Sequence, residues 1–302
     1  MPRRFDIWSD NPDHDWSPDS DAFTTHVRTA AVHTDWDVTT PPPPGGDRWT
    51  TWDHPGLQRG PEPHPDWVVT SGDAHDTELG VLKTGKEADA HLLVRTGPET
   101  SCMLVAKRYR GAEHTLFHNT SGYTQARTAP KSRDRRAIAN RTRHGRAVAA
   151  GQWADTEWTT LVRLWNAGVT VPYPVSRDHH EILMEFIDAG DGAAAPRLVQ
   201  TDPTADELSE WFEQFHTVVV QLARLGLAHA DLSPYNILVR PTAHGRSELV
   251  VIDWPQVVDV IANSEGMTLL QRDISVVCRW FAAKGHACDP DELFAEACSH
   301  LY

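Results

Sequence analysis

Lysine and cysteine are both scarce in this 302-residue chain, which holds five lysines among 28 Lys and Arg and only four cysteines. No two cysteines form C-x-x-C, so we expect no disulfide framework but free, packed thiols in a reducing, cytoplasmic setting. No apolar run approaches the roughly 18 residues that a membrane span needs. The N-terminal MPRRFDIWSD has no apolar core like that of a signal peptide. We therefore expect a cytoplasmic protein with no membrane partner.

The charge is strongly acidic overall but unevenly distributed. A formal net charge of −14 argues against a general nucleic-acid binder. Residues 107–146, however, contain 11 Lys and Arg against 2 Asp and Glu, a local charge of +9. The basic stretch 127–146 is either a solvated loop or a contact surface for RNA, a ribosomal partner or another acidic partner, and its composition leaves both interpretations open.

Residues 1–66 differ in composition from the rest of the chain. They hold 11 of the 21 prolines, 12 acidic and 5 basic residues. Such a composition does not readily bury enough surface to fold alone. Five tryptophans nevertheless lie in this segment, so we predict an extended tail that docks some of them on the folded body. A fully disordered leader is the alternative, and a globular pattern begins at residue 67.

The remaining chain alternates short apolar runs with helical periodicity, which favours an α+β fold. We expect strands at 101–109, 180–187, 237–240 and 249–252, and a hairpin formed by 79–83 and 90–95. We expect helices at 152–167 and 204–225, and a final helical region that holds Leu270, Ile274, Val277 and Phe281 and stops at Gly285.

The hairpin carries G-V-L-K-T-G-K-E (80–87), which has a partial match to the G-x-x-x-x-G-K-[ST] phosphate loop. Gly80, Gly85 and Lys86 stand at the expected places. Glu87 occupies the position where that motif needs a hydroxyl to ligate Mg²⁺. The stretch is therefore a damaged phosphate loop, a coincidence, or a different device for holding phosphate.

Lys107 and Glu157 are charged residues in apolar patterns. Lys107 alternates with Met103 and Val105 on one strand face, and from the strand alone we favour a lysine that snorkels at the edge. Glu157 lies within the apolar stripe of helix 152–167, where a carboxylate is costly unless it is paired. The two together predict a Lys107–Glu157 ion pair, the pair with which protein kinases hold ATP phosphates.

The strongest signal is L-A-H-A-D-L-S-P-Y-N-I-L-V (227–239), which follows a long helix and precedes a strand. Asp231 and Asn236 have the D-x-x-x-x-N spacing of a kinase catalytic loop, in which Asp231 would accept the hydroxyl proton and Asn236 would hold a metal. Asp253 ends the apolar strand before Trp254. Asn236, Asp253 and phosphate oxygens would together make an oxygen-only Mg²⁺ site.

These motifs resemble the RIO family of atypical serine/threonine protein kinases. K-T-G-K-E-A-D (83–89) is similar to the family's phosphate loop S-T-G-K-E-A-N, H-A-D-L-S-P-Y-N to its H-x-D-L-S-x-Y-N loop, and I-D-W-P-Q (252–256) to its I-D-x-x-Q metal loop. M-E-F-I (184–187) looks like its hinge and W-A-D-T-E-W (153–158) like its helix C. The likeness spans roughly 67–285 and is closest to bacterial-like members without an N-terminal winged helix.

The resemblance implies a two-lobed protein kinase-like fold with a reduced C-lobe that lacks an activation loop and peptide-docking helices. We expect an N-lobe at 67–184, a hinge at 185–190 and a C-lobe at 191–302. ATP and Mg²⁺, or Mn²⁺ in its place, would bind between the lobes. Catalytic roles would fall to Asp231 and Asp253, and metal binding to Asn236 and Asp253. The ATP contacts would come from Thr84, Gly85, Lys86, Glu87, Lys107, Glu157, Met184 as gatekeeper, Glu185, Ile187 and Ser233.

The chain also departs from the kinase patterns at several positions. Lys83 replaces the Ser and Asp89 the Asn of the RIO phosphate loop, and Asp89 adds negative charge near it. Trp254-Pro255 stands where ordinary kinases have Phe-Gly, and a proline there restrains its neighbour. We therefore predict that Asp253 does not flip between two orientations. Ala230 replaces the Arg that reads a phosphorylated activation loop.

Three classes of function follow. The first is a RIO-type Ser/Thr kinase that phosphorylates a protein or itself, or an ATPase in which Asp253 transiently accepts the phosphoryl group. The second is a small-molecule phosphotransferase resembling aminoglycoside or choline kinases, which also carry H-x-D-x-x-x-x-N followed by I-D. The third is a nucleotide-gated binding module that uses the 127–146 loop. RIO relatives are associated with maturation of the small ribosomal subunit, so the resemblance also raises a ribosomal role.

Overall fold

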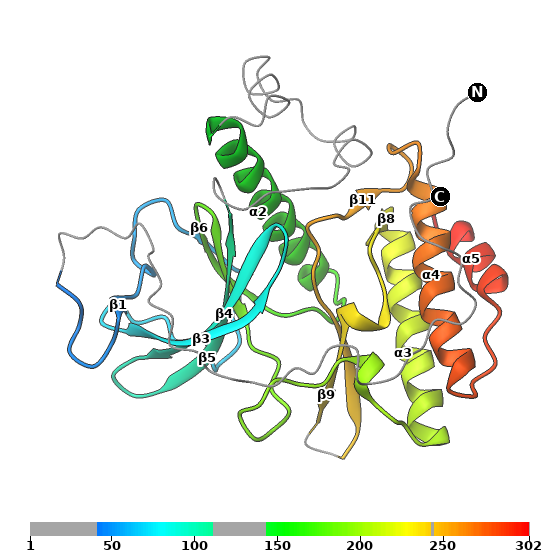
Figure 1. Ribbon diagram of the computed structural model, residues 1–302, viewed down its shortest axis with the longest axis horizontal. Coiled ribbons are helices and arrows are strands. Elements are labelled where there is room, and N and C mark those ends of the chain that lie inside the picture. The colour runs from blue at the N-terminus through cyan, green and yellow to red at the C-terminus, as the bar shows by residue number, and fades with distance from the viewer. Residues whose placement is uncertain (1–40, 111–142, 243–244, 302) are drawn as a thin grey trace.

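The computed structural model describes residues 41–110, 143–242 and 245–301. Its N-lobe is built on a curled seven-stranded antiparallel sheet of strand order β1-β3-β4-β5-β7-β6-β2 (Figure 1). The strands are β1 (Arg48–Trp49), β2 (Gln58–Arg59), β3 (His75–Thr84), β4 (Ala88–Thr96), β5 (Ser101–Tyr109), β6 (Pro174–Asp178) and β7 (Glu181–Glu185).

Alternation along the central strands gives the sheet two different faces. Leu93 of β4 pairs with Leu104 of β5, and both are fully buried in an apolar cluster with Ala106. Because side chains alternate between faces, Val105 and Lys107 of β5 point to the opposite side. We call this second side the nucleotide face, because the sequence predicts that Lys107, which lies on it, contacts ATP.

Part of the proline-rich N-terminal segment belongs to the N-lobe. Strand β1 pairs with β3 at one edge of the sheet, and β2 pairs with β6 at the other edge. The side chain of Trp52 is buried with Leu57 in the apolar cluster of Leu93 and Leu104. We call the side of the sheet that bears this cluster the outer face. The N-lobe thus begins upstream of the boundary predicted at residue 66.

Arg48 ties this segment to the sheet through buried ion pairs. Its guanidinium contacts Asp76 at 3.1 Å and Glu181 at 2.8 Å. Arg95, on β4, also contacts Asp76, at 2.8 Å. Buried charges are stable only when they are paired in this way, so residue 48 is a structural member of the lobe.

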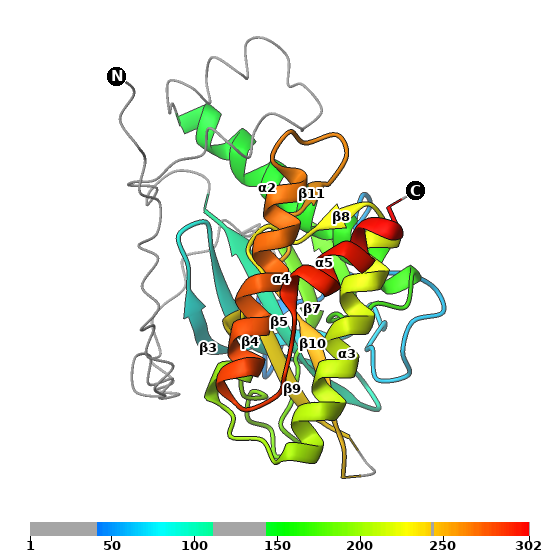
Figure 2. The same ribbon diagram turned by 90° about the vertical axis from the view of Figure 1, so that its right-hand side faces the viewer.

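The C-lobe is mainly helical and lies on the far side of α2 from the sheet (Figure 1). Helices α3, α4 and α5 lie side by side there, as both views show (Figure 2). Helix α3 begins with a capping box, in which Thr204 and Glu207 satisfy each other's backbone N–H groups. Helix α2 (Arg143–Asn166) packs against the sheet. The C-lobe elements are η2 (Leu198–Gln200), α3 (Ala205–Arg224), β8 (Leu227–Ala228), η3 (Pro234–Asn236), β9 (Ile237–Pro241), β10 (Ser247–Val251), β11 (Val258–Asp259), α4 (Gly266–Ala283) and α5 (Pro290–Ser299).

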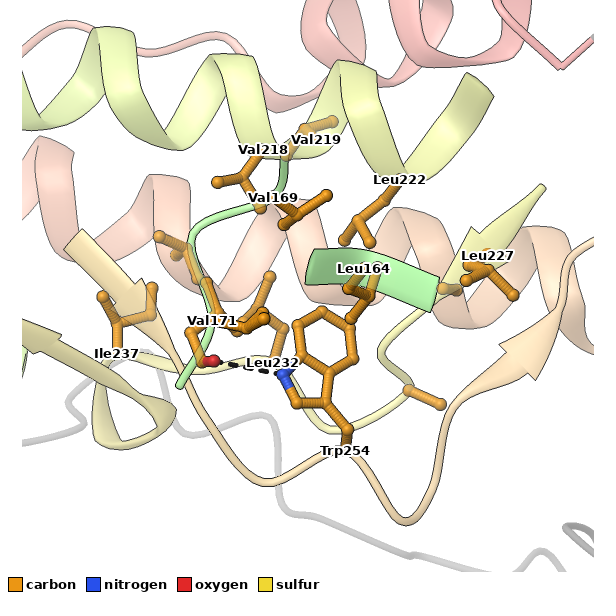
Figure 3. Packing of buried hydrophobic residues seen from close by; sticks show 14 of the residues in the cluster. Leu164, Val169, Val171, Val218, Val219, Leu222, Leu227, Leu232, Ile237 and Trp254 are labelled. Carbon is orange, nitrogen blue, oxygen red and sulfur yellow. Dashed lines mark hydrogen bonds between the residues drawn. The ribbon is translucent and has the colours of Figure 1, made fainter. Parts of the chain in front are cut away.

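Trp254 anchors the segment after Asp253 in the main core. Its indole is fully buried, and its Nε1–H donates to the carbonyl oxygen of Val251 at 3.0 Å. Figure 3 shows the ring packed beside Leu164 of α2 and Leu232 of the loop before η3. A side chain of this size fixed on one side of Asp253 restricts the backbone at that residue.

Among the described residues, no helix is both long and apolar enough to cross a membrane. The prediction that the C-terminal cysteines pack as free thiols is wrong for two of them, because Cys278 and Cys288 are joined by a disulfide. A separation of ten residues does not by itself indicate a disulfide. The chain turns back after the end of α4, which brings the two residues to a Cα–Cα distance of 5.7 Å. Cys102 and Cys298 are free.

Candidate active site

The predicted ion pair is present. The Nζ atom of Lys107 lies 2.7 Å from Oε1 of Glu157 on α2 and 2.6 Å from Oδ1 of Asp253. Lys107 therefore connects the sheet, helix α2 and the segment after β10. One cation joins three elements that are far apart in sequence, which brings Lys107, Glu157 and Asp253 into one site as the sequence patterns suggested.

Burial and pairing act in opposite directions on these charges. Burial alone would lower the pKa of Lys107, but the carboxylates of Asp253 and Glu157 raise it well above its usual range. Burial would raise the pKa of Asp253, but the Lys107 ammonium dominates and holds it at about 2. Asp253 is thus an anion and Lys107 a cation throughout the physiological range.

Glu157 has two further partners that sequence reasoning missed. The hydroxyl of Tyr109 donates a hydrogen bond to Oε2 of Glu157, and the backbone N–H of Trp254 donates to Oε1 at 3.2 Å. Tyr109 follows Lys107 by two residues, so both side chains lie on the nucleotide face. The i, i+2 spacing of a tyrosine beside the lysine was the signal in the sequence.

The catalytic-loop residues are held by a set of local hydrogen bonds. The amide nitrogen of Asn236 donates to the carbonyl oxygen of Asp231 at 2.9 Å. His229 is fully buried, and its Nε2 lies 3.0 Å from the carbonyl oxygen of Ile252 while its Nδ1 accepts from the backbone N–H of Asp231. These contacts fit a neutral imidazole that donates at Nε2, and burial lowers the pKa of His229 to about 4. His229 therefore braces the loop against the strand that leads to Asp253.

Asp273 of α4 also holds the catalytic loop, and the sequence analysis did not predict this role. Its carboxylate accepts from the backbone N–H groups of Ala230, at 2.7 Å, and Leu232, at 3.0 Å. Ala230 has a φ of 66°, a left-handed conformation that a non-glycine residue adopts only when its surroundings enforce it. The neighbouring Arg272 lies 3.9 Å from the carboxylate of Asp231, which is about half exposed. Burial nevertheless raises the pKa of Asp231, although Arg272 lowers it.

The donor set around Asp253 suits a hard cation that also binds phosphate. No group of three or more His, Cys, Asp or Glu side chains in the described parts of the chain could hold a metal on its own. The Nδ2 group of Asn236 donates to the carbonyl oxygen of Asp231, which fixes the orientation of the amide. Its Oδ1 atom is the oxygen that could bind a metal. An amide oxygen and the Asp253 carboxylate are oxygen ligands of the kind with which Mg²⁺ combines phosphate oxygens and water. These residues fit the expected metal.

Thr84, Gly85, Lys86 and Glu87 form the turn between β3 and β4. The turn is closed by a hydrogen bond from the N–H of Gly85 to the carbonyl oxygen of Ala88 at 2.9 Å. A Cβ atom at residue 85 would lie 2.8 Å from that oxygen, so the turn requires glycine. Thr84 and Lys86 are exposed at its tip. The negative charge expected from Asp89 is neutralised, because Asp89 pairs with Arg110.

The expected hinge residues lie where the two lobes join. Met184 and Ile187 are buried, and the carbonyl oxygen of Ile187 accepts from Ala195 at 2.9 Å. The carboxylate of Glu185 is held by the N–H of Tyr173 at 3.0 Å and by Arg240 at 2.7 Å. A contact of Glu185 with adenine would therefore use its backbone. The ATP roles of these residues and of Ser233, which precedes η3, remain predictions.

The remaining site prediction concerns the basic stretch 127–146. Residues 111–142 lie outside the described part of the chain, and for 143–146 only the helical backbone of α2 is described. The proposed RNA or ribosomal contact therefore stays a prediction from composition.

Comparison with known proteins connects this geometry to a family. The sequence pattern of the RIO domain matches residues 104–293. The chain is 28% identical over 241 residues to the serine/threonine-protein kinase RIO1 of Saccharomyces cerevisiae, with 75% of this chain and 48% of that protein covered. It is 32% identical over 156 residues to the RIO-type serine/threonine-protein kinase Rio1 of Haloferax volcanii, with 50% and 49% covered. The chain spans about half the length of these curated relatives.

Solved structures support the same fold. The Rio2 kinase from Chaetomium thermophilum, crystallised as an ADP/Mg²⁺–phosphoaspartate complex, matches with a TM-score of 0.55 at 21% identity, over 73% of this chain and 60% of that one. Another structure of this kinase matches with a TM-score of 0.52 at 21% identity, over 72% and 61%. At this identity the likeness concerns the fold, which is the kinase-like α+β architecture with a reduced C-lobe.

Proposed function

The chain belongs to the RIO domain family, and on that premise we propose that it transfers the terminal phosphoryl group of ATP with the help of Mg²⁺. The observation that carries the proposal is the position of Lys107, 2.7 Å from Glu157 and 2.6 Å from Asp253. Phosphoryl transfer depends mainly on positioning and charge neutralisation. A lysine fixed between two carboxylates is suited to both.

Each residue has a defined task in this proposal. Lys107 binds nucleotide phosphate, and Glu157 keeps its ammonium in place. Asp231 accepts the proton of the attacking hydroxyl, and its half-exposed carboxylate opens toward solvent, from which a substrate can approach. Asn236 and Asp253 hold Mg²⁺, which when bound neutralises the charge of the phosphate oxygens. The acceptor is a serine or threonine hydroxyl of another protein or of this chain.

A second route uses Asp253 as the acceptor. Its carboxylate attacks the terminal phosphorus, ADP leaves, and water then hydrolyses the acyl phosphate to restore the carboxylate and release phosphate. Support comes from the anionic state of Asp253 and from the related Rio2 kinase, which was crystallised as a phosphoaspartate complex. The family membership also favours both routes over the small-molecule phosphotransferase and the binding module.

Labelled ATP distinguishes these possibilities. The full chain, Asp231→Ala and Asp253→Ala are incubated with γ-labelled ATP and Mg²⁺, and acid-stable label, hydroxylamine-labile label and free phosphate are separated. Stable label on Ser or Thr that is lost in Asp231→Ala indicates a protein kinase. Free phosphate with a hydroxylamine-labile adduct, lost in Asp253→Ala, indicates the ATPase route. ATP consumption that rises only with a small alcohol contradicts both.

The proposal includes a cytoplasmic location, which the small number of cysteines favours. The Cys278–Cys288 disulfide weighs against it, because structural disulfides are rare in reducing compartments. Alkylation of thiols in freshly lysed cells, followed by mass spectrometry, tests the location. Free Cys278 and Cys288 in the cell agree with a cytoplasmic protein, whereas a quantitative disulfide contradicts it.

A further inference from the structure

Lys83 stands at the end of β3, one residue before the Thr84–Glu87 turn, at a position where the RIO phosphate-loop pattern has Ser. It is solvent-accessible, so a simple charged surface residue is the default interpretation. The pairing of β3 with β4 argues against that interpretation.

A β-bulge decides which face Lys83 occupies. Val81 pairs with His91 and Lys83 pairs with Ala90, so two residues advance on β3 while one advances on β4. Leu82 is the additional residue. An earlier bulge between Glu78 and Gly80 has already exchanged the faces once. Continuing the register of Val81 and His91 would place Leu82 opposite Ala90 and turn Lys83 to the outer face, because a one-residue shift exchanges the faces. Bulges commonly re-aim side chains beside active sites, and this one turns Lys83 to the nucleotide face.

The same row of the sheet contains Lys107. Lys83 pairs with Ala90, and Ala90 pairs with Lys107 of β5, so the two lysines share one face on either side of a small residue. Two strand spacings separate their Cα atoms, which is about 10 Å. The alanine leaves the space between the two side chains open, and both can reach a group that lies over β4.

The charges that act on Lys83 include residues of the candidate active site. Partial desolvation by the surrounding protein lowers the pKa of Lys83 although the residue is exposed at the surface, and the charge of Asp253 acts in the opposite direction. Arg197 and Lys107 lower this pKa further, whereas Asp231 raises it. Lys83 therefore interacts electrostatically with the proposed base, Asp231, and the proposed metal ligand, Asp253. These two residues mark the phosphate end of the site. A second cation this close to Lys107 is stabilised by an anion that lies between them.

We infer that Lys83 is a phosphate-contacting residue, which binds the terminal phosphate of a nucleoside triphosphate together with Lys107. The inference rests on the proposed function and adds to it a residue that the phosphate-loop pattern does not predict. Because Asp253 and Asp231 mark where the transferred group lies, the contact is to the terminal phosphate and not to the adenosine end. Lys83 accordingly distinguishes nucleoside triphosphates from diphosphates.

Nucleotide affinity measures this directly and needs no turnover. Binding of a non-hydrolysable ATP analogue and of ADP, each with Mg²⁺, is measured by calorimetry for the full chain, Lys83→Met, Lys83→Arg and Lys83→Ser. We expect Lys83→Met and Lys83→Ser to lose about tenfold or more in affinity for the ATP analogue, the scale of one hydrogen bond to a charged group. Their affinity for ADP should change less than about twofold, and Lys83→Arg should keep most of the discrimination.

Two controls separate this contact from general charge effects. Lys284→Met removes a lysine that pairs with Asp202 in the C-lobe and should bind both nucleotides like the wild type. The exchange Leu82→Lys/Lys83→Leu keeps composition and charge but moves the ammonium out of the row. It should behave like Lys83→Met. Circular dichroism checks that each variant is folded.

The outcomes are distinct from those of the labelling experiment. Equal losses for ADP and the ATP analogue, no loss in Lys83→Met, or full affinity in the exchange variant would each overturn the inference. A protein that discriminates between the nucleotides through Lys83 but transfers no phosphate supports the contact and contradicts the proposed function. A wild-type chain that binds neither nucleotide overturns both.

Discussion

The hydroxyl of Tyr109 donates its hydrogen bond to the carboxylate of Glu157, the same group that Lys107 contacts at 2.7 Å. Lys107 and Tyr109 are i and i+2 on β5, and the Lys107 ammonium also lies 5.6 Å from the centre of the Tyr109 ring. Glu157 is almost completely buried, so its oxygens depend on these two donors and on the backbone N–H of Trp254. Tyr109 is therefore a positioning residue for the lysine.

Tyr109→Phe should weaken phosphoryl transfer without removing the lysine. The variant leaves Oε2 of Glu157 without this donor, which costs about 1–3 kcal/mol. We expect kcat to fall about tenfold while KM for ATP changes little, because Lys107 still reaches the phosphates. Steady-state kinetics and thermal melting measure the two effects. A stability loss with unchanged kcat would show that Tyr109 acts only in folding.

Lys107 and Glu157 should be energetically coupled. Lys107→Met and Glu157→Gln are each expected to reduce kcat/KM by about 100-fold or more, since each breaks a buried pair. The double variant should be little worse than either single variant, because contacting residues are not additive. A double-mutant cycle on kcat/KM provides the measurement. Additive losses would mean that Glu157 contributes to activity by a route that does not pass through Lys107.

Acid should destabilise the fold through His229. Its pKa is about 4 when folded, against about 6.5 in an unfolded chain. The unfolded state therefore binds more protons between these values, and the free energy of unfolding falls as pH drops from about 6.5 to 4, by up to about 3 kcal/mol. Asp273 acts in the opposite sense over the same range, because burial raises its pKa to about 7. Urea unfolding of the wild type and of His229→Gln should therefore show the His229 contribution as the difference between the two slopes.

The pH range over which stability changes distinguishes the contribution of His229 from that of Asp253. The carboxylate of Asp253 has a folded pKa of about 2, so its contribution is complete above about pH 4 and is lost only below that. A slope between pH 4 and 6.5 that persists unchanged in His229→Gln would contradict the prediction.

Gly85→Ala should loosen the Thr84–Glu87 turn, which is expected to face the phosphates. A Cβ atom there would lie 2.8 Å from the carbonyl oxygen of Ala88, and a backbone atom cannot easily move away. We expect affinity for ATP to fall about tenfold, with a stability loss of roughly 1–3 kcal/mol from overpacking. Gly151→Ala is the matched control. Gly151 lies in helix α2, and a Cβ atom there would lie 3.3 Å from a side-chain atom of His180. Gly151→Ala should leave ATP binding unchanged.

The sequence allowed those parts of the site to be predicted that carry a strong local pattern. A lysine in an apolar alternation and a glutamate in an apolar stripe identified the Lys107–Glu157 pair, because buried charges are rare unless paired. The D-x-x-x-x-N spacing located Asp231 and Asn236. The i, i+2 spacing from Lys107 was a signal for Tyr109, but it does not identify the partner Glu157, which is remote in sequence. Asp273 was missed because its partners are backbone N–H groups, which leave no mark in the sequence.

The same distinction holds for the fold. Helix α3 was predicted to within a residue at each end, since it has a capping box and a continuous apolar stripe. Strands β1 and β2 have two residues each, too few for any periodicity. Helix α5 had signals that we did not use, because Asp289 caps its first turn and Pro290 occupies its first position. The bulge that turns Lys83 depends on pairing between strands and has no local sequence mark.

Strands β1 and β2 have a consequence for how this protein behaves among copies of itself. The short segment between Arg48 and Arg59 occupies both open edges of the curled sheet, pairing with β3 at one and with β6 at the other. Unpaired edge strands are templates for edge-to-edge aggregation. One short stretch thus covers part of both edges of the sheet, and its loss would open both edges to pairing with another copy of the chain.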